Sequence, residues 1–221
     1  MQQRLAALNE AMGDRASYSN GNSQDALSEI LKPLALTGMA EVGEALSQQL
    51  NRARPQDRAK LFEGKVSQPA TDVMQWYLLW AIGLNGHGQV PVELLKTPWT
   101  IPSNTMEKYW QPAPAAAWTM AQLGQADAAT LSALIDRLSF TDDPLWLKGD
   151  FVGALTALTG EPFGYDLAAW QTWWSQQAHS WNSHKKLSFT TDVVCLVLNG
   201  GINPIITNPR QGKGLKPLVQ G

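Results

Sequence analysis

Apolar residues recur at helical spacing in one segment after another along most of this chain. Four stripes of this kind stand out: Leu27, Ile30, Leu31 and Leu34; Val42, Leu46 and Leu50; Leu131, Leu134, Ile135 and Leu138; and Leu147, Phe151, Ala154, Leu155 and Leu158. No segment before residue 185 alternates apolar and polar side chains over the length of a strand. The sequence therefore predicts an all-α fold.

One of the expected helices is apolar on nearly every side. The stretch from Val73 to Leu84 places Trp76 and Trp80 on one stripe, and Leu78 and Ile82 on the other side of the helix. A helix without a polar face must be covered all round. We therefore expect an inner helix here.

Helices in this chain are expected to end at regularly spaced glycines, each followed by a short turn and a second helix. The glycines taken as helix ends lie about 36 to 45 residues apart, and Gly200 lacks the second stripe: Gly38, Gly83, Gly124, Gly160 and Gly200. Helix pairs with this period stack into solenoids. We expect a short right-handed α-solenoid of stacked antiparallel helix pairs over residues 1–184, and a C-terminal extension over residues 185–221.

Within residues 115–177, an Ala-rich helix closed by Gly124 is followed by a second helix and then by Asp143-Pro144. Leu147-Lys148 comes next, and it occupies the place of the aliphatic and basic pair that follows Asp-Pro in HEAT repeats. This segment resembles bacterial HEAT-like (armadillo-type) helical repeat proteins. The resemblance covers under a third of the chain and implies an α-solenoid.

The C-terminal extension differs in composition from the rest. The β-branched runs 193–198 and 202–206 flank Asn199-Gly200, which predicts either a short β-hairpin or one more short helix. Residues 208–221 are rich in Pro, Gly and Lys and have little to bury, so we expect an irregular tail.

Charge and hydropathy exclude several classes of protein. The chain of 221 residues has 17 basic and 19 acidic side chains, and this near balance gives no nucleic-acid-binding face. No window approaches 18 consecutive apolar residues, so no membrane span is expected. Residues 1–12 lack the pattern of a secretory signal, which predicts a cytoplasmic protein, or a periplasmic one if the chain is a trimmed mature form.

The titratable residues show no catalytic or metal-binding pattern. Asp142 and Asp143 are adjacent and point in different directions, so we interpret Asp143 as the cap of a helix that has Pro144 at its first position. His179 and His184 are five residues apart, which does not place two metal ligands on one helical face. We expect no cofactor, no metal and no catalytic residues.

The ten tryptophans are the most unusual feature of the composition. Five of them lie on apolar stripes and are expected to fill space between helices: Trp76, Trp80, Trp118, Trp170 and Trp173. Trp99 and Trp110 lie in or beside a Pro-rich connection. They either hold that loop to the body of the protein or form an exposed contact patch.

These patterns predict a non-enzymatic module that binds another protein, as an adaptor, a complex subunit or a toxin-neutralising protein. Stacked helix pairs leave a concave surface lined by the second helices, which can vary without disturbing the core. The expected partner contacts are polar residues on those helices and the two loop tryptophans: Gln48, Gln49, Glu93, Lys96, Trp99, Trp110, Asp136, Arg137 and Gln171.

An alternative is a helical protein that binds or cleaves polysaccharide. Trp99, Trp110 and Trp146 would be sugar platforms, and acids such as Asp142 and Glu161 would lie near a cleft. The sequence identifies no pair of acids at a defined separation, so we rank this alternative lower. The oligomeric state is left open.

Overall fold

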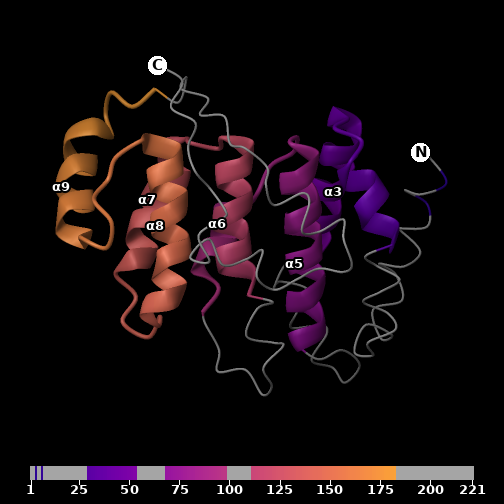
Figure 1. Ribbon diagram of the computed structural model, residues 1–221, viewed down its shortest axis with the longest axis horizontal. Coiled ribbons are helices and arrows are strands. Elements are labelled where there is room, and N and C mark those ends of the chain that lie inside the picture. The colour runs from indigo at the N-terminus through magenta and orange to yellow at the C-terminus, as the bar shows by residue number, and fades with distance from the viewer. Residues whose placement is uncertain (1–2, 4–5, 7–28, 54–67, 99–110, 183–221) are drawn as a thin grey trace. The chain divides into compact units, whose positions relative to one another are not determined.

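The computed structural model describes residues 29–53, 68–98 and 111–182, together with Gln3 and Ala6, and of residues 68–73 only the backbone. Over these residues the protein is all-helical and contains no strand, which confirms the predicted class (Figure 1). Several predictions concern residues outside the described part of the chain: the roles of Trp99 and Trp110, the helix end at Gly200, the choice between hairpin and helix, the irregular tail, and the boundary after residue 184.

The helices follow one another along the chain. Residues 29–35 are helical, and the further elements are α3 (Ala40–Arg52), α5 (Gln68–Asn85), the 3-10 helix η3 (Val92–Lys96), α6 (Pro112–Leu123), α7 (Ala128–Leu138), α8 (Leu145–Thr159) and α9 (Leu167–Gln177). The described residues form two compact units. The first contains residues 29–53, 68–91 and 111–112, and the second contains residues 92–98 and 113–182.

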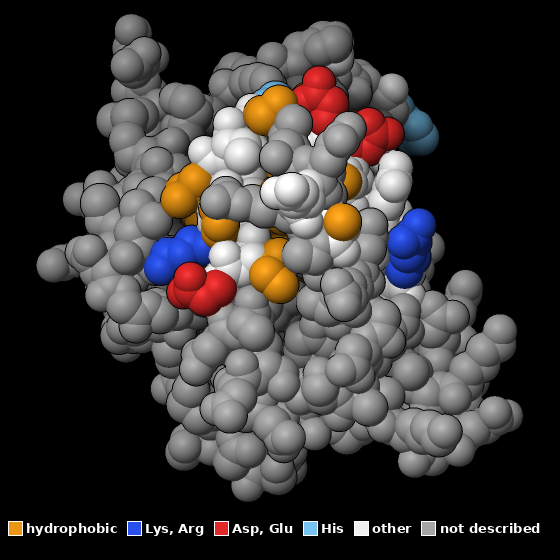
Figure 2. Space-filling view, turned by 90° about the vertical axis from the view of Figure 1, so that its right-hand side faces the viewer, with side chains coloured by type: hydrophobic (Ala, Val, Ile, Leu, Met, Phe, Trp, Pro, Cys, Tyr) orange, Lys and Arg blue, Asp and Glu red, His pale blue; other side chains and the backbone are white. Residues whose placement is uncertain are grey.

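In the first unit, α3 packs against α5. The predicted stripe of Val42, Leu46 and Leu50 is buried on α3, and every residue from Met74 to Gly83 is buried on α5. These positions confirm the predicted inner helix. Figure 2 views the molecule from the side of α3, where apolar, acidic and basic side chains of the described residues are interspersed.

The predicted helix ends are correct at three of the four described glycines. Gly38, Gly124 and Gly160 have φ of 59°, 64° and 80°, in the left-handed region that glycine adopts after a helix. The prediction for Gly83 is wrong, because this residue is buried inside α5. The apolar pattern continues beyond it, and α5 ends just before Gly86, whose φ is 77°.

A close approach of backbones fixes the loop after α5 to the middle of α3. A Cβ atom at Gly43 would lie 2.3 Å from the carbonyl oxygen of His87. Ser47 Oγ donates a hydrogen bond to the Gly43 carbonyl at 2.9 Å and accepts one from the Gln89 amide at 3.0 Å. The loop therefore lies directly on the α3 backbone. His87 itself is exposed.

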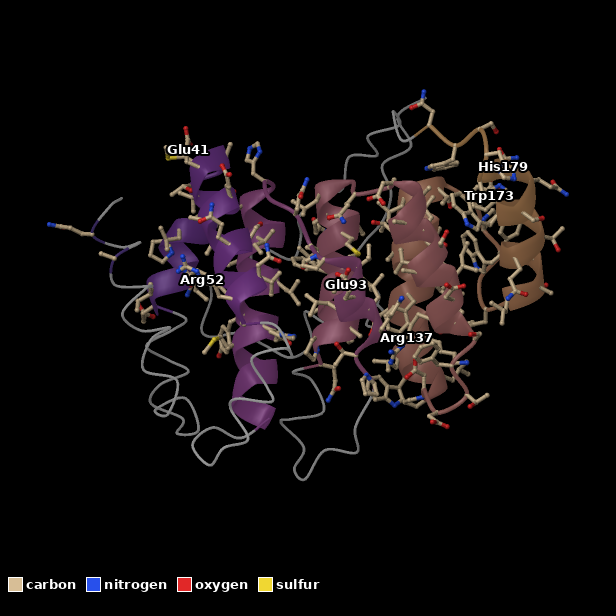
Figure 3. All side chains as sticks on the ribbon, turned by 180° about the vertical axis from the view of Figure 1, so that it is seen from behind. Glu41, Arg52, Glu93, Arg137, Trp173 and His179 are labelled. Atoms are coloured by element: carbon tan, nitrogen blue, oxygen red, sulfur yellow. The ribbon has the colours of Figure 1, made fainter. Side chains whose placement is uncertain are left out.

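In the second unit, α7 packs against α8, η3 and α9. The predicted stripes of α7 and α8 are buried, and the two helices run antiparallel from the turn that joins them (Figures 1 and 3). This is the helix pair that a repeat protein requires. The stacking of such pairs into a right-handed solenoid stays a prediction.

We predict that Gly43→Ala destabilises the first unit. Alanine in a helix is favoured over glycine by about 1 kcal/mol when nothing obstructs it, but here the added methyl group meets the His87 carbonyl, and overpacking costs about 1 to 3 kcal/mol. The midpoint of urea unfolding, followed by circular dichroism, should fall.

The matched control is Glu44→Ala on the exposed face of α3, which should leave the midpoint unchanged or raise it slightly. A higher midpoint for Gly43→Ala would show that the loop does not press against α3.

Candidate functional site

Arg137 lies in the last turn of α7, three residues after the buried Leu134. Its side chain is only 1% exposed. The guanidinium faces Asp143 and donates two parallel hydrogen bonds to it, from Nε to Oδ2 at 2.6 Å and from Nη2 to Oδ1 at 2.7 Å. This is the bidentate geometry in which an arginine and a carboxylate pair most strongly.

The remaining contacts of Arg137 tie three further parts of the second unit together. Nη1 donates to the carbonyl oxygens of Leu95 at 3.0 Å and Thr97 at 2.7 Å, on either side of the end of η3. The guanidinium carbon lies 4.5 Å from the ring centre of Phe140 and 5.3 Å from that of Phe151 in α8. We refer to Arg137, Asp143 and these two carbonyl groups as the Arg137 clamp; Arg137 is labelled in Figure 3.

The clamp corrects the interpretation of Asp143. The residue that precedes α8 is Pro144, and no side chain caps this helix, because the Asp143 carboxylate is turned toward Arg137. A buried arginine requires a buried counter-charge, and this demand outweighs the smaller gain from a helix cap.

The turn between α7 and α8 exposes large apolar side chains, and one of them, Phe140, lies over the guanidinium of the clamp. Phe140 is 38% exposed and Leu145 is 66% exposed, and Trp146 beside it is half-buried. We refer to Phe140, Leu145 and Trp146 as the apolar turn. Two contacts hold the backbone of the turn. The Asp143 carboxylate is bonded to Arg137, and the Lys148 ammonium donates a hydrogen bond to the Leu138 carbonyl at 2.8 Å.

Two exposed carboxylates lie beside Phe140 in the sequence. Asp136 precedes it by four residues, and Asp142 follows it by two. Within the part of the chain that the structure describes, neither carboxylate forms an ion pair, and Asp142 accepts only a long hydrogen bond of 3.4 Å from Thr141. The surface of the apolar turn therefore combines apolar groups with unpaired negative charge.

A second concentration of aromatic side chains surrounds α9. Successive ring centres of this aromatic cluster are 5.0 to 6.3 Å apart: Phe163, Trp170, Trp173, Trp174 and Trp181. Most of these pairs meet edge to face, the geometry that aromatic rings favour. Trp170 is fully buried and the other four are half-buried.

Three indole groups of the aromatic cluster hold α9 to its surroundings. Trp170 donates to the Gly164 carbonyl at 2.9 Å, Trp174 donates to Ser132 Oγ in α7 at 2.9 Å, and Trp181 donates to the Ala126 carbonyl at 2.6 Å. The rings contact one another, and these three indole N–H groups are hydrogen-bonded within the protein. The aromatic cluster is therefore a fastening of α9 to α7.

The other tryptophans placed on apolar stripes by the sequence are buried, as predicted. Trp76 and Trp80 lie in α5 and Trp118 lies in α6. Trp173 departs from the prediction in part, because it is only half-buried in the aromatic cluster.

The expected partner contacts are distributed over both units. Gln48 and Gln171 are exposed on α3 and α9, whereas Gln49 is buried. Glu93, Lys96 and Asp136 are exposed. The packing of η3 on α7 brings together the two elements that carry these last three residues.

The expected role of Arg137 as a partner contact does not fit its position. Its guanidinium is occupied by Asp143 and by two carbonyl groups, and almost none of its surface reaches solvent. The same reasoning applies to Gln49, which is buried on α3.

Sequence reasoning missed Phe140 and Leu145. A signal for them exists, because Phe140 lies beyond the stripe that ends at Leu138, and Leu145 lies two residues before the stripe that begins at Leu147. Apolar residues outside the periodic stripe do not belong to the face that the helix buries.

No group of three His, Cys, Asp or Glu side chains that could hold a metal ion occurs among the described residues. None of the helices in this part of the chain is both long enough and apolar enough to cross a membrane. Two of the residues considered for a polysaccharide site, Trp146 and Asp142, lie close in sequence at the apolar turn, and Glu161 is half-buried after α8.

We predict that Asp143→Asn lowers the free energy of unfolding of the second unit by about 3 to 5 kcal/mol, because it leaves the buried Arg137 without a counter-charge. Urea unfolding followed by circular dichroism measures this. The neighbouring Asp142→Asn is the control and should change stability by less than about 0.5 kcal/mol, since Asp142 is exposed. Asparagine caps helices well, so a small effect of Asp143→Asn would restore the capping interpretation.

We predict that Trp174 and Ser132 are energetically coupled. Trp174→Phe and Ser132→Ala each remove the same hydrogen bond, so the double variant should be more stable than the sum of the single effects implies, by about 1 kcal/mol. Trp173→Phe is the matched control, because its indole group is not bonded to Ser132. Independent effects of Trp174→Phe and Ser132→Ala would contradict the fastening of α9 through this bond.

Comparison of the chain with protein-family models, with curated proteins and with solved structures gives no match. The resemblance of residues 115–177 to HEAT-like repeats therefore rests on the residues that carry it. The Arg137 clamp and the apolar turn are the features of this chain that bear on its function.

Proposed function

We propose that this protein is a non-enzymatic binding module that engages another protein, and that the apolar turn is the centre of the contact. The observation that carries this proposal is the exposure of Phe140 and Leu145 on a backbone held by a buried ion pair. A few residues near the centre of an interface supply most of its binding energy, and aromatic residues such as phenylalanine are enriched there.

The Arg137 clamp supports this proposal because it makes the turn rigid before any partner arrives. Binding costs free energy whenever a loop or side chain must be ordered. Phe140 rests on the guanidinium of Arg137, and Asp143 anchors the backbone between Phe140 and Leu145. A turn ordered in this way loses little conformational entropy on binding.

The polar residues expected to contact a partner supply the rim of such an interface. Glu93 and Lys96 on η3 and Asp136 on α7 are exposed on two elements that pack together. Exposed polar groups around an apolar centre are the usual anatomy of a protein interface. In this proposal the helix pairs stack as in HEAT-like proteins.

The polysaccharide alternative is supported by one feature, the half-buried Trp146 in the same turn as the exposed Asp142. The aromatic cluster offers less support, because its rings are packed against one another. The crosslinking experiment described next distinguishes protein binding from polysaccharide binding.

The test is to replace Leu145 with the photoreactive amino acid p-benzoylphenylalanine in the full chain, expressed in its native cells. We expect ultraviolet light to produce a discrete adduct with another protein, and Phe140→Ala in the same chain to reduce its yield at least about tenfold, as for the loss of a central contact residue. Mass spectrometry identifies the adduct.

The matched control carries the probe at Tyr165, which is 51% exposed in the same unit but outside the apolar turn, and it should not form this adduct. The proposal is wrong if neither position forms a protein adduct while the chain binds an array of immobilised oligosaccharides and loses that binding on Trp146→Ala.

A further inference from the structure

The basic groups near the apolar turn are occupied internally. Arg137 is paired with Asp143, and the Lys148 ammonium is bonded to the Leu138 carbonyl. The carboxylates of Asp136 and Asp142 are exposed instead, and neither has an ion-pair partner among the described residues. The exposed charged side chains on either side of Phe140 in the sequence are therefore both acidic, whereas Lys148 is half-buried and keeps its positive charge.

Charges on the neighbouring 3-10 helix do not reverse this balance. Lys96 at the end of η3 is exposed, and Glu93 in its first turn is exposed as well. These two charges are opposite, so Asp136 and Asp142 give the exposed side chains of η3, α7 and the turn an excess of negative charge.

We infer that the partner presents a cationic amphipathic segment, in which apolar side chains contact Phe140 and Leu145 while lysine or arginine side chains pair with Asp136 and Asp142. Complementary charge at the rim of an interface raises the association rate and selects the partner. This inference rests on the proposed function and specifies the chemistry of its partner.

The same charges disfavour the other possible occupants. A symmetric contact with a second copy of this chain would place the same patch on both sides, and the carboxylates of the two copies would repel each other. Nucleic acids and membranes of anionic lipid carry the same sign as the two carboxylates and would be repelled. A basic protein segment fits both the apolar and the charged groups.

The experiment uses the full chain and two labelled model peptides, an amphipathic helix of Leu and Lys and its counterpart of Leu and Glu. Fluorescence anisotropy should show tighter binding of the Leu/Lys peptide. Leu145→Ala should weaken this binding about tenfold. The double variant Asp136→Asn/Asp142→Asn should weaken it about threefold to tenfold at 50 mM salt, and by much less at 500 mM salt, because exposed charges are screened.

The matched control is Glu41→Gln/Glu44→Gln, which removes two exposed carboxylates of α3 and should leave binding unchanged. The inference is overturned if the control weakens binding as much as the double variant does, or if the Leu/Glu peptide binds equally well. It is also overturned if sedimentation shows a dimer that Leu145→Ala abolishes, since the occupant is then a second copy of the chain.

The experiments distinguish failure of the cationic partner from failure of the proposed function. A protein adduct from the probe at Leu145, together with equal affinity for both peptides, retains the proposed function and overturns the cationic partner. Absence of the adduct together with absence of peptide binding overturns both.

Discussion

The positive charge of Arg137 is the constraint on which the second unit depends. A guanidinium that is almost completely removed from water must be neutralised and hydrogen-bonded, and here Asp143 and two carbonyl groups of the chain segment at η3 meet this need. One side chain therefore sets the positions of η3, the end of α7 and the turn that leads into α8. The exposure of Phe140 and Leu145 follows from this fixed backbone.

Different physical contacts fasten the other elements. The aromatic cluster holds α9 to α7 through edge-to-face rings and through indole hydrogen bonds to Ser132 and Ala126. In the first unit, the absence of a side chain at Gly43 lets the loop at His87 lie on α3. Much of the unusual tryptophan content is thus explained by packing. The large apolar side chains that remain exposed in the second unit include two of the apolar turn.

The apolar turn is both held in place by the Arg137 clamp and exposed to solvent. Its rigidity comes from an ion pair beneath it, and its chemistry comes from residues that the core does not need. Phe140 and Leu145 lie outside the buried stripes of α7 and α8, and the carboxylates of Asp136 and Asp142 have no ion pair among the described residues. A cationic amphipathic partner would use both features at once.

The sequence alone determined the all-α class, the inner helix α5, the buried stripes and three of the four described helix-ending glycines, because these depend on local periodicity and on the left-handed conformation of glycine. It misplaced Asp143 as a cap, Gly83 as a helix end and Arg137 as a surface contact. Only the tertiary structure decided these, because the burial of a helix and of the side chains on it depends on residues distant along the chain. Arg137 is bonded to carbonyl groups about 40 residues before it, and no local pattern records that contact.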